Sequence, residues 1–195
     1  MPSHRFAFSS ALVLLAAAAC NTAGLQSAQQ SGRLNVYLTD APLDDVASAT
    51  VTISKVYLIG GSDESGSRYT VTDTPQDYDL LTLQDGVTAL LGSASIPAGD
   101  YTQLRLVVDQ ATITLAPGVT FSDGSSAKTL KVPSGGQSGI KIHLAGPLHI
   151  EPGETNLIVD FDVSQNFVFT GEPSHPNGVL FKPVLHASLE DAAAP

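Results

Sequence analysis

Sulfur-containing and tryptophan side chains are nearly absent from this sequence. The 195 residues include one cysteine, Cys20, one methionine and no tryptophan. A single cysteine excludes a disulfide framework within the chain, so the apolar core must stabilise the fold. A chain of this length buries about 70% of its unfolded surface, which is enough for folding without disulfides or metals.

Basic residues are scarce as well. The chain has 9 Lys and Arg against 19 Asp and Glu, a formal net charge of −10. The basic residues are scattered singly, whereas nucleic-acid binding requires a basic stripe that neutralises phosphates. The sequence therefore predicts no nucleic-acid partner, and no adsorption to anionic lipid through charge alone.

Recognisable catalytic motifs are also missing. The sequence has no Gly-x-Ser-x-Gly elbow, no phosphate-binding loop ending in Gly-Lys-Ser/Thr, and no repeat of about 20–50 residues. No two histidines have the i, i+2 or i, i+4 spacing of a zinc site. We therefore expect neither enzymatic activity nor a cofactor.

The N-terminus has the layout of a bacterial lipoprotein signal. His4 and Arg5 precede an apolar run over residues 6–19, and three alanines stand directly before Cys20. This run is shorter than the about 20 residues of a membrane-spanning helix. The pattern predicts a signal peptide over 1–19 and a lipid on Cys20, which would attach the protein to a membrane of the cell envelope. In a Gram-negative host, we expect the outer membrane.

The rest of the chain divides into a tether, one domain and a short tail. Residues 20–32 are small and polar without periodicity, which is typical of a flexible tether after the lipidated cysteine. Residues 33–190 show period-two alternation of apolar residues and form one predicted domain, followed by a tail over 191–195. Within one strand the alternation changes phase between Ile53 and Val56, which predicts a β-bulge near Ser54 and Lys55.

The alternation predicts about nine or ten short strands. They cover residues 34–38, 51–58, 69–71, 77–82, 101–115 with a phase change after residues 109–110, 129–132, 140–144, 157–163, 167–169 and 179–189. One helix is expected over 83–92, where four apolar residues have helical spacing and Gly92 can end it. The predicted fold class is all-β with at most one short helix, an antiparallel two-sheet β-sandwich of immunoglobulin-like or transthyretin-like type. A closed barrel is the alternative, since alternation does not separate the two.

Four segments together resemble a known family. They are Leu38-Thr39-Asp40-Ala41-Pro42; residues 96–105, IPAGDYTQLR; residues 132–141, VPSGGQSGIK; and Asp160-Phe161-Asp162 followed by Leu180-Phe181-Lys182-Pro183. Their order and spacing resemble the bacterial and archaeal envelope family catalogued as domain of unknown function 4382, typically lipoproteins. The resemblance implies a β-sandwich at the cell envelope and transfers no catalytic residue. The Pro-Ala-Gly-x-Tyr turn also resembles transthyretin-like modules.

Acidic residues gather at two places that could meet in the fold. One place is the loop after the first strand, with Asp40, Asp44 and Asp45; the other is a late strand with Asp160 and Asp162. Calcium takes several oxygen ligands, and these five carboxylates could supply them if the two strands pair. The other interpretation is a solvated surface on an acidic protein.

These observations predict a lipid-anchored envelope protein with a non-catalytic binding or structural module. Its expected partners are the membrane, through the lipid on Cys20, and an envelope protein or glycan. One alternative is an envelope hydrolase for glycan or peptide that uses Asp160, Asp162 and a histidine. A second alternative is an accessory subunit of an envelope complex.

The lipid anchor can be tested with Cys20→Ser. Because the lipid is attached to the cysteine sulfur, the variant should leave the membrane fraction or remain unprocessed. Fractionation of cells and the mass of the mature protein measure this. An unchanged mass and an unchanged membrane fraction would show that Cys20 carries no lipid.

Overall fold

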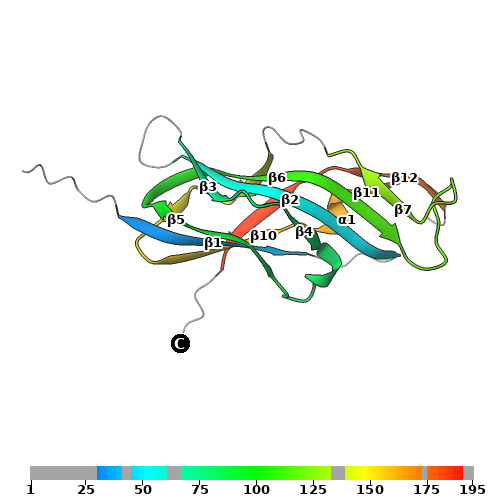
Figure 1. The fold of residues 1–195 in the computed structure, drawn as a ribbon, viewed down its shortest axis with the longest axis horizontal. Helices are drawn as coiled ribbons and strands as arrows, with labels where there is room; N and C mark the ends of the chain where they lie inside the picture. Colours follow the sequence, from blue (N-terminus) through cyan, green and yellow to red (C-terminus); the bar gives the residue numbers. More distant parts are fainter. Residues whose placement is uncertain (1–29, 41–44, 61–66, 133–138, 173–174, 191–195) are drawn as a thin grey trace, which may run out of the picture.

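The computed structural model describes residues 30–40, 45–60, 67–132, 139–172 and 175–190 (Figure 1). The elements are β1 (Ser31–Thr39), β2 (Val46–Gly60), β3 (Arg68–Thr72), β4 (Gln76–Asp79), η1 (Leu80–Thr82), β5 (Ala89–Pro97), β6 (Gly99–Leu115), β7 (Ala127–Leu130), β8 (Ile140–Leu144), β9 (Leu148–Ile150), β10 (Glu154–Asp160), α1 (Val163–Asn166), β11 (Phe167–Glu172), β12 (His175–Phe181) and β13 (Leu185–Leu189). The all-β class is confirmed. No helix in these ranges is long and apolar enough to cross a membrane.

Eleven strands form one hydrogen-bonded sheet instead of the two facing sheets that the sequence predicted. The strand order is β3-β2-β6-β8-β13-β10-β1-β5, with β4 on β2 and both β7 and β9 on β6. The expectation of purely antiparallel pairing is wrong at two places, because β1 pairs with β10, and β8 with β13, in parallel. A separate hairpin of β11 and β12 completes the fold. The large sheet curls around the core into a nearly closed, barrel-like form.

The two ends of the large sheet meet at a seam between β3 and β5. A Cβ atom added to Gly92 on β5 would lie 2.8 Å from Thr72 Cβ and 3.3 Å from Val71 Cγ1 on β3. Near this seam, the Tyr78 hydroxyl donates a hydrogen bond to the Leu90 carbonyl at 3.3 Å, which joins β4 to β5. β3 and β5 are the first and last strands in the strand order and are not hydrogen-bonded neighbours in it. Side-chain packing therefore closes the seam.

The long strands β2 and β6 carry the predicted bulge. Their register shifts on both sides of Ile53, so that Ser54 and Asp109 have no opposite partner in the ladder. The Ser54 hydroxyl donates to the Asp109 carboxylate at 2.9 Å across this irregularity. The bulge thus keeps Ile53 and Val56 both inside the core despite their opposite parity.

The helix predicted over 83–92 is wrong. Asp85 and Gly86 have φ of +57° and +84°, and this left-handed pair interrupts a right-handed helix. Val87 and Leu90, which were expected on its apolar face, are 51% and 49% exposed. The segment instead contains a loop and the start of β5, while a short α1 forms where a strand end was predicted.

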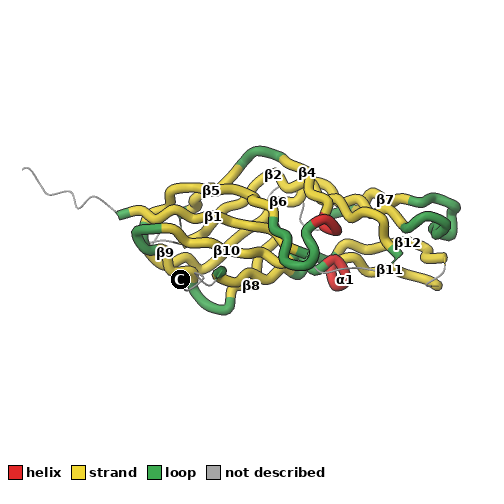
Figure 2. Tube along the Cα trace, turned by 90° about the horizontal axis from the view of Figure 1, so that it is seen from below, coloured by secondary structure: helices red, strands yellow, loops and turns green. Residues whose placement is uncertain are grey.

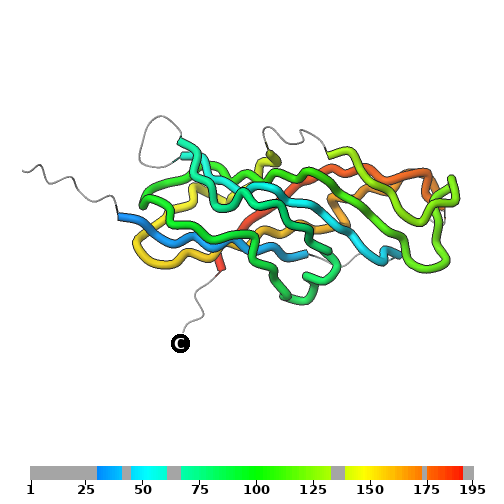
Figure 3. The backbone as a smooth tube through the Cα atoms, in the orientation of Figure 1, coloured from blue at the N-terminus to red at the C-terminus, as the bar shows by residue number. Residues whose placement is uncertain are grey.

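The domain is elongated, and its two ends differ. β1 begins at one end, close to β9 and to the start of β10, where Arg33 N–H donates to the Gly153 carbonyl at 2.7 Å. β7 and the β11–β12 hairpin lie at the other end (Figures 1 and 3). We call these the β1 end and the hairpin end.

A corner at Gly99 leads the chain from β5 into β6. Gly99 has φ of +151°, a conformation that residues with a side chain rarely adopt. Two residues later the buried Tyr101 donates its hydroxyl to the Pro97 carbonyl at 2.7 Å and so fixes the corner. The turn predicted before Tyr101 is confirmed.

Gly99→Val should lower the free energy of unfolding by about 1–3 kcal/mol, because valine strongly disfavours this φ. Denaturant unfolding measures the change. The matched control is Gly146→Val: Gly146 has no positive φ, and no atom lies within 4 Å of its added Cβ. Equal losses of stability in the two variants would show that the backbone conformation at Gly99 does not require glycine.

Candidate functional site

A groove at the hairpin end separates β7 from β12. It is lined by Lys128–Lys131 on one side and Gly178–Lys182 on the other, with a volume of about 670 Å³. We call it the β7–β12 groove. In Figure 2 the two strands lie next to each other at this end of the domain. The groove is therefore built by two segments about 50 residues apart in the chain.

Both walls of the groove are edge strands within the described part of the chain. β7 pairs only with β6, and β12 pairs only with β11. An edge strand presents backbone N–H and C=O groups that another extended chain can pair with. Leu130 and Phe181 are buried beneath the groove, whereas Leu180 is 48% exposed.

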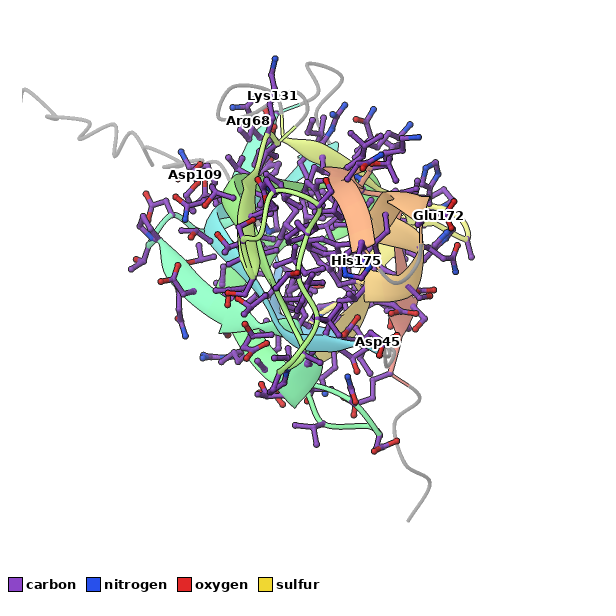
Figure 4. All side chains as sticks on the ribbon, turned by 90° about the vertical axis from the view of Figure 1, so that its right-hand side faces the viewer. Asp45, Arg68, Asp109, Lys131, Glu172 and His175 are labelled. Atoms are coloured by element: carbon purple, nitrogen blue, oxygen red, sulfur yellow. The ribbon has the colours of Figure 1, made fainter. Side chains whose placement is uncertain are left out.

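Three lysines line the groove in an otherwise acidic protein. Lys128, Lys131 and Lys182 are three of the nine basic residues of the chain. Lys128 pairs with Asp123 and lies 5.2 Å from the centre of the Phe121 ring. Figure 4, a view onto the hairpin end, shows Lys131 extending outward at the rim. The groove therefore offers positive charge beside apolar surface.

The positive charge of Lys128 is paired with the carboxylate of Asp123. The Lys128 ammonium and the hydroxyl and N–H of Ser125 hold the pKa of Asp123 well below its usual range. Among the described residues, neither Lys131 nor Lys182 forms an ion pair. These two ammonium groups remain available to an acidic ligand.

The position of β12 depends on one buried amide, that of Asn166 at the end of α1. Its side chain is 0% exposed; it donates to the Phe161 carbonyl and accepts from Val184 N–H at 2.6 Å. Its backbone carbonyl accepts from Lys182 N–H at 2.8 Å. Asn166 thus ends β12 at the groove and redirects the chain into β13. The single strand predicted over 179–189 is therefore two strands that belong to different sheets.

Three of the five acidic residues predicted to bind calcium form hydrogen bonds at the start of α1. β1 and β10 do pair, with Thr39 opposite Asp160. The buried Asp40 accepts from Val163 N–H at 2.8 Å, and Asp160 accepts from Asp162 N–H at 3.1 Å. Asp162, with φ of +38°, accepts from Gln165 N–H at the start of α1 and is not on a strand face with Asp160.

Of the remaining two predicted ligands, one lies elsewhere and the other is outside the described residues. Asp45 precedes β2, and its carbonyl accepts from Ala116 N–H at 2.9 Å. Asp44, like Cys20, lies outside the described residues. Across the described ranges, no group of three or more carboxylate, imidazole or thiol side chains could hold a metal ion. The calcium site stays a prediction from the sequence.

The histidines fall into two arrangements. His143 and His186 are register partners on β8 and β13, with ring centres 5.6 Å apart, and Asp160 is the register partner of His186. All three are exposed on the outer face of the sheet. The hydrolase alternative uses Asp160, Asp162 and a histidine: Asp160 is the register partner of His186, and Asp162 caps α1.

His149 forms the second arrangement, at the β1 end. Its Nδ1 lies 2.5 Å from an Asp100 carboxylate oxygen, and Nε2 lies 3.6 Å from Glu151. The hydrogen bond with Asp100 raises the pKa of His149, so this pair is strongest at acidic pH and is lost as the pH rises through that raised pKa. A shallow pocket of about 280 Å³ adjoins it and is lined by Glu154 and Glu190.

Sequence reasoning missed the β7–β12 groove and the role of Asn166. The groove requires knowing that β7 and β12 are both edges, which is a property of the strand order. Lys128 and Lys131 are close in sequence but Lys182 is distant, so no basic run indicates them. For Asn166 a weak signal exists, an asparagine directly before the apolar residues 167–169.

Comparisons with known proteins place the chain in context. A family model described as "Domain of unknown function (DUF4382)" matches residues 31–183. Neither the curated proteins nor the solved structures provide a match. The matched range covers every element from β1 to β12, including both walls of the groove.

Asn166→Ala should lower the free energy of unfolding by about 2–5 kcal/mol, because the Phe161 carbonyl and the Val184 N–H would both lose a buried partner. The matched control is Asn177→Ala on β12, where the asparagine is exposed. Thermal or denaturant unfolding compares the two variants. A loss at position 166 no larger than at 177 would contradict the anchoring role.

Proposed function

Because the chain belongs to the DUF4382 family, whose description assigns no activity, we propose a function from the geometry. The protein is a lipid-tethered, non-catalytic envelope module that binds an extended acidic segment of another envelope protein in its β7–β12 groove. The observation that carries this proposal is the combination of two edge strands and three lysines around one groove.

The edge strands favour an extended ligand. A segment in β conformation can add to the free edge of β7 or β12 through main-chain hydrogen bonds, and its alternate side chains then face the groove. Leu130 and Phe181 provide apolar surface below, and Leu180 provides it at the rim.

The lysines favour an acidic ligand. Lys131 and Lys182 stand at the same groove without an ion pair in the described structure, and the rest of the protein carries an excess of carboxylates. An acidic segment would be repelled elsewhere and attracted here. Such complementarity contributes to specificity and to the rate of association.

The tether supports the same orientation. A lipid on Cys20 would attach the protein near the β1 end, because residues 20–30 lead directly into β1. The groove lies at the opposite, hairpin end (Figure 1). It would thus face away from the membrane, where segments of other proteins are accessible.

The chemistry of the groove supports binding and not catalysis. Its lining consists of three lysines, one threonine, one glycine and four apolar residues. Neither a carboxylate nor an imidazole is among them, so Thr129 has no carboxylate or imidazole base within the groove to activate it.

The test uses full-length protein in mild detergent and two labelled peptides, one of alternating Glu and Val and one of alternating Gln and Val. The Glu peptide should bind, and Lys131→Gln combined with Lys182→Gln should weaken its affinity about two- to thirtyfold, since exposed charges contribute about 0.2–1 kcal/mol each. Fluorescence anisotropy at low salt measures both affinities.

The matched control is Lys141→Gln, an exposed lysine on β8 outside the groove. It should leave the affinity unchanged. Equal binding of both peptides, or equal weakening by the control, would overturn the proposal.

A further inference from the structure

The outer face of the large sheet carries a histidine pair that the groove does not involve. His143 on β8 and His186 on β13 are direct register partners in a parallel pair of strands. Their ring centres are 5.6 Å apart, and the planes are inclined by 32°. The two imidazoles thus stand side by side although 43 residues separate them in the sequence.

The backbone holds both rings on the solvent side. Ile142 precedes His143 and Leu185 precedes His186, and both apolar side chains are buried in the core. Because successive side chains of a strand point to opposite faces, the two histidines must point outward. Neither ring can turn inward without pulling a core residue into water.

We propose that His143 and His186 bind one divalent transition-metal ion, such as Zn²⁺, Ni²⁺ or Cu²⁺, through one nitrogen each. Imidazole nitrogens lie about 2.0–2.1 Å from zinc, which places two ring centres about 5 Å apart in a tetrahedral site. The observed separation is close to this value, so small side-chain rotations suffice. Water fills the other positions, because the described residues offer no group of three such ligands.

The surroundings favour a cation of this class. Asp160 is the register partner of His186 on the next strand and adds a carboxylate to the same face. The chain as a whole carries a net charge of −10. Neutral imidazole selects zinc, nickel and copper, whereas calcium and magnesium prefer oxygen ligands. The two imidazoles therefore favour a transition metal over calcium, although Asp160 is also one of the predicted calcium ligands.

The metal would join β8 to β13. This parallel pair is short and runs from Leu185 opposite Ile142 to Ala187 opposite Leu144. A ligand that binds only the folded state raises the melting temperature by mass action. Occupancy can thus be followed by thermal unfolding as well as by calorimetry, independently of any binding to the groove.

The experiment titrates Ni²⁺ and, separately, Zn²⁺ into chelator-treated, full-length mature protein in mild detergent. We expect saturable binding of one ion per chain and a rise in melting temperature. His143→Gln and His186→Gln should each weaken binding at least tenfold, and the double variant should lose it. Any change in melting temperature that calcium produces should be the same in the wild type and in the His143→Gln and His186→Gln variants.

Two controls make the result specific. His149→Gln and His175→Gln remove the other histidines of the described domain and should leave the metal affinity unchanged. The metal-free melting temperatures of His143→Gln and His186→Gln should equal that of the wild type, because both side chains are exposed. Metal binding that persists in the double variant, or that His149→Gln abolishes, would overturn the proposal.

Discussion

The buried side chain of Asn166 is the contact on which the hairpin end depends. Its amide and backbone carbonyl satisfy groups at the exit of β10, the exit of β12 and the entry of β13. Without these bonds, three chain segments would have to bury unpaired polar groups at one place. The amide therefore separates the two sheets, and through Lys182 it sets one wall of the groove.

The sequence predicted local structure well and long-range arrangement poorly. Alternation identified most strands, and its phase change located the bulge at Ser54, because both depend on which residues face the core. The helix over 83–92 failed because Asp85 and Gly86 adopt left-handed conformations that apolar spacing does not reveal. Strand order and closure of the sheet depend on distant pairings such as β1 with β10, which alternation cannot specify.

Prediction of the candidate sites was likewise limited by long-range arrangement. The pairing of β1 with β10 did bring Asp40, at the end of β1, and Asp160 to neighbouring strands, but one oxygen of each accepts a backbone N–H at or just before the start of α1. Spacing rules found no zinc motif, because His143 and His186 meet only through parallel pairing of β8 with β13. The groove lysines likewise gather only once two edge strands come together.

The place of β1 in the sheet has a mechanical consequence. β1 lies between β10 and β5; it pairs with β10 from Arg33 to Thr39 and with β5 from Ser31 to Leu38. If the protein is tethered through its N-terminal side as proposed, a pull along the axis of β1 would load these two ladders in shear, so that many hydrogen bonds share the force at once. A domain held by such a strand resists extraction by drag or by a bound partner better than one held by an edge strand that peels away bond by bond.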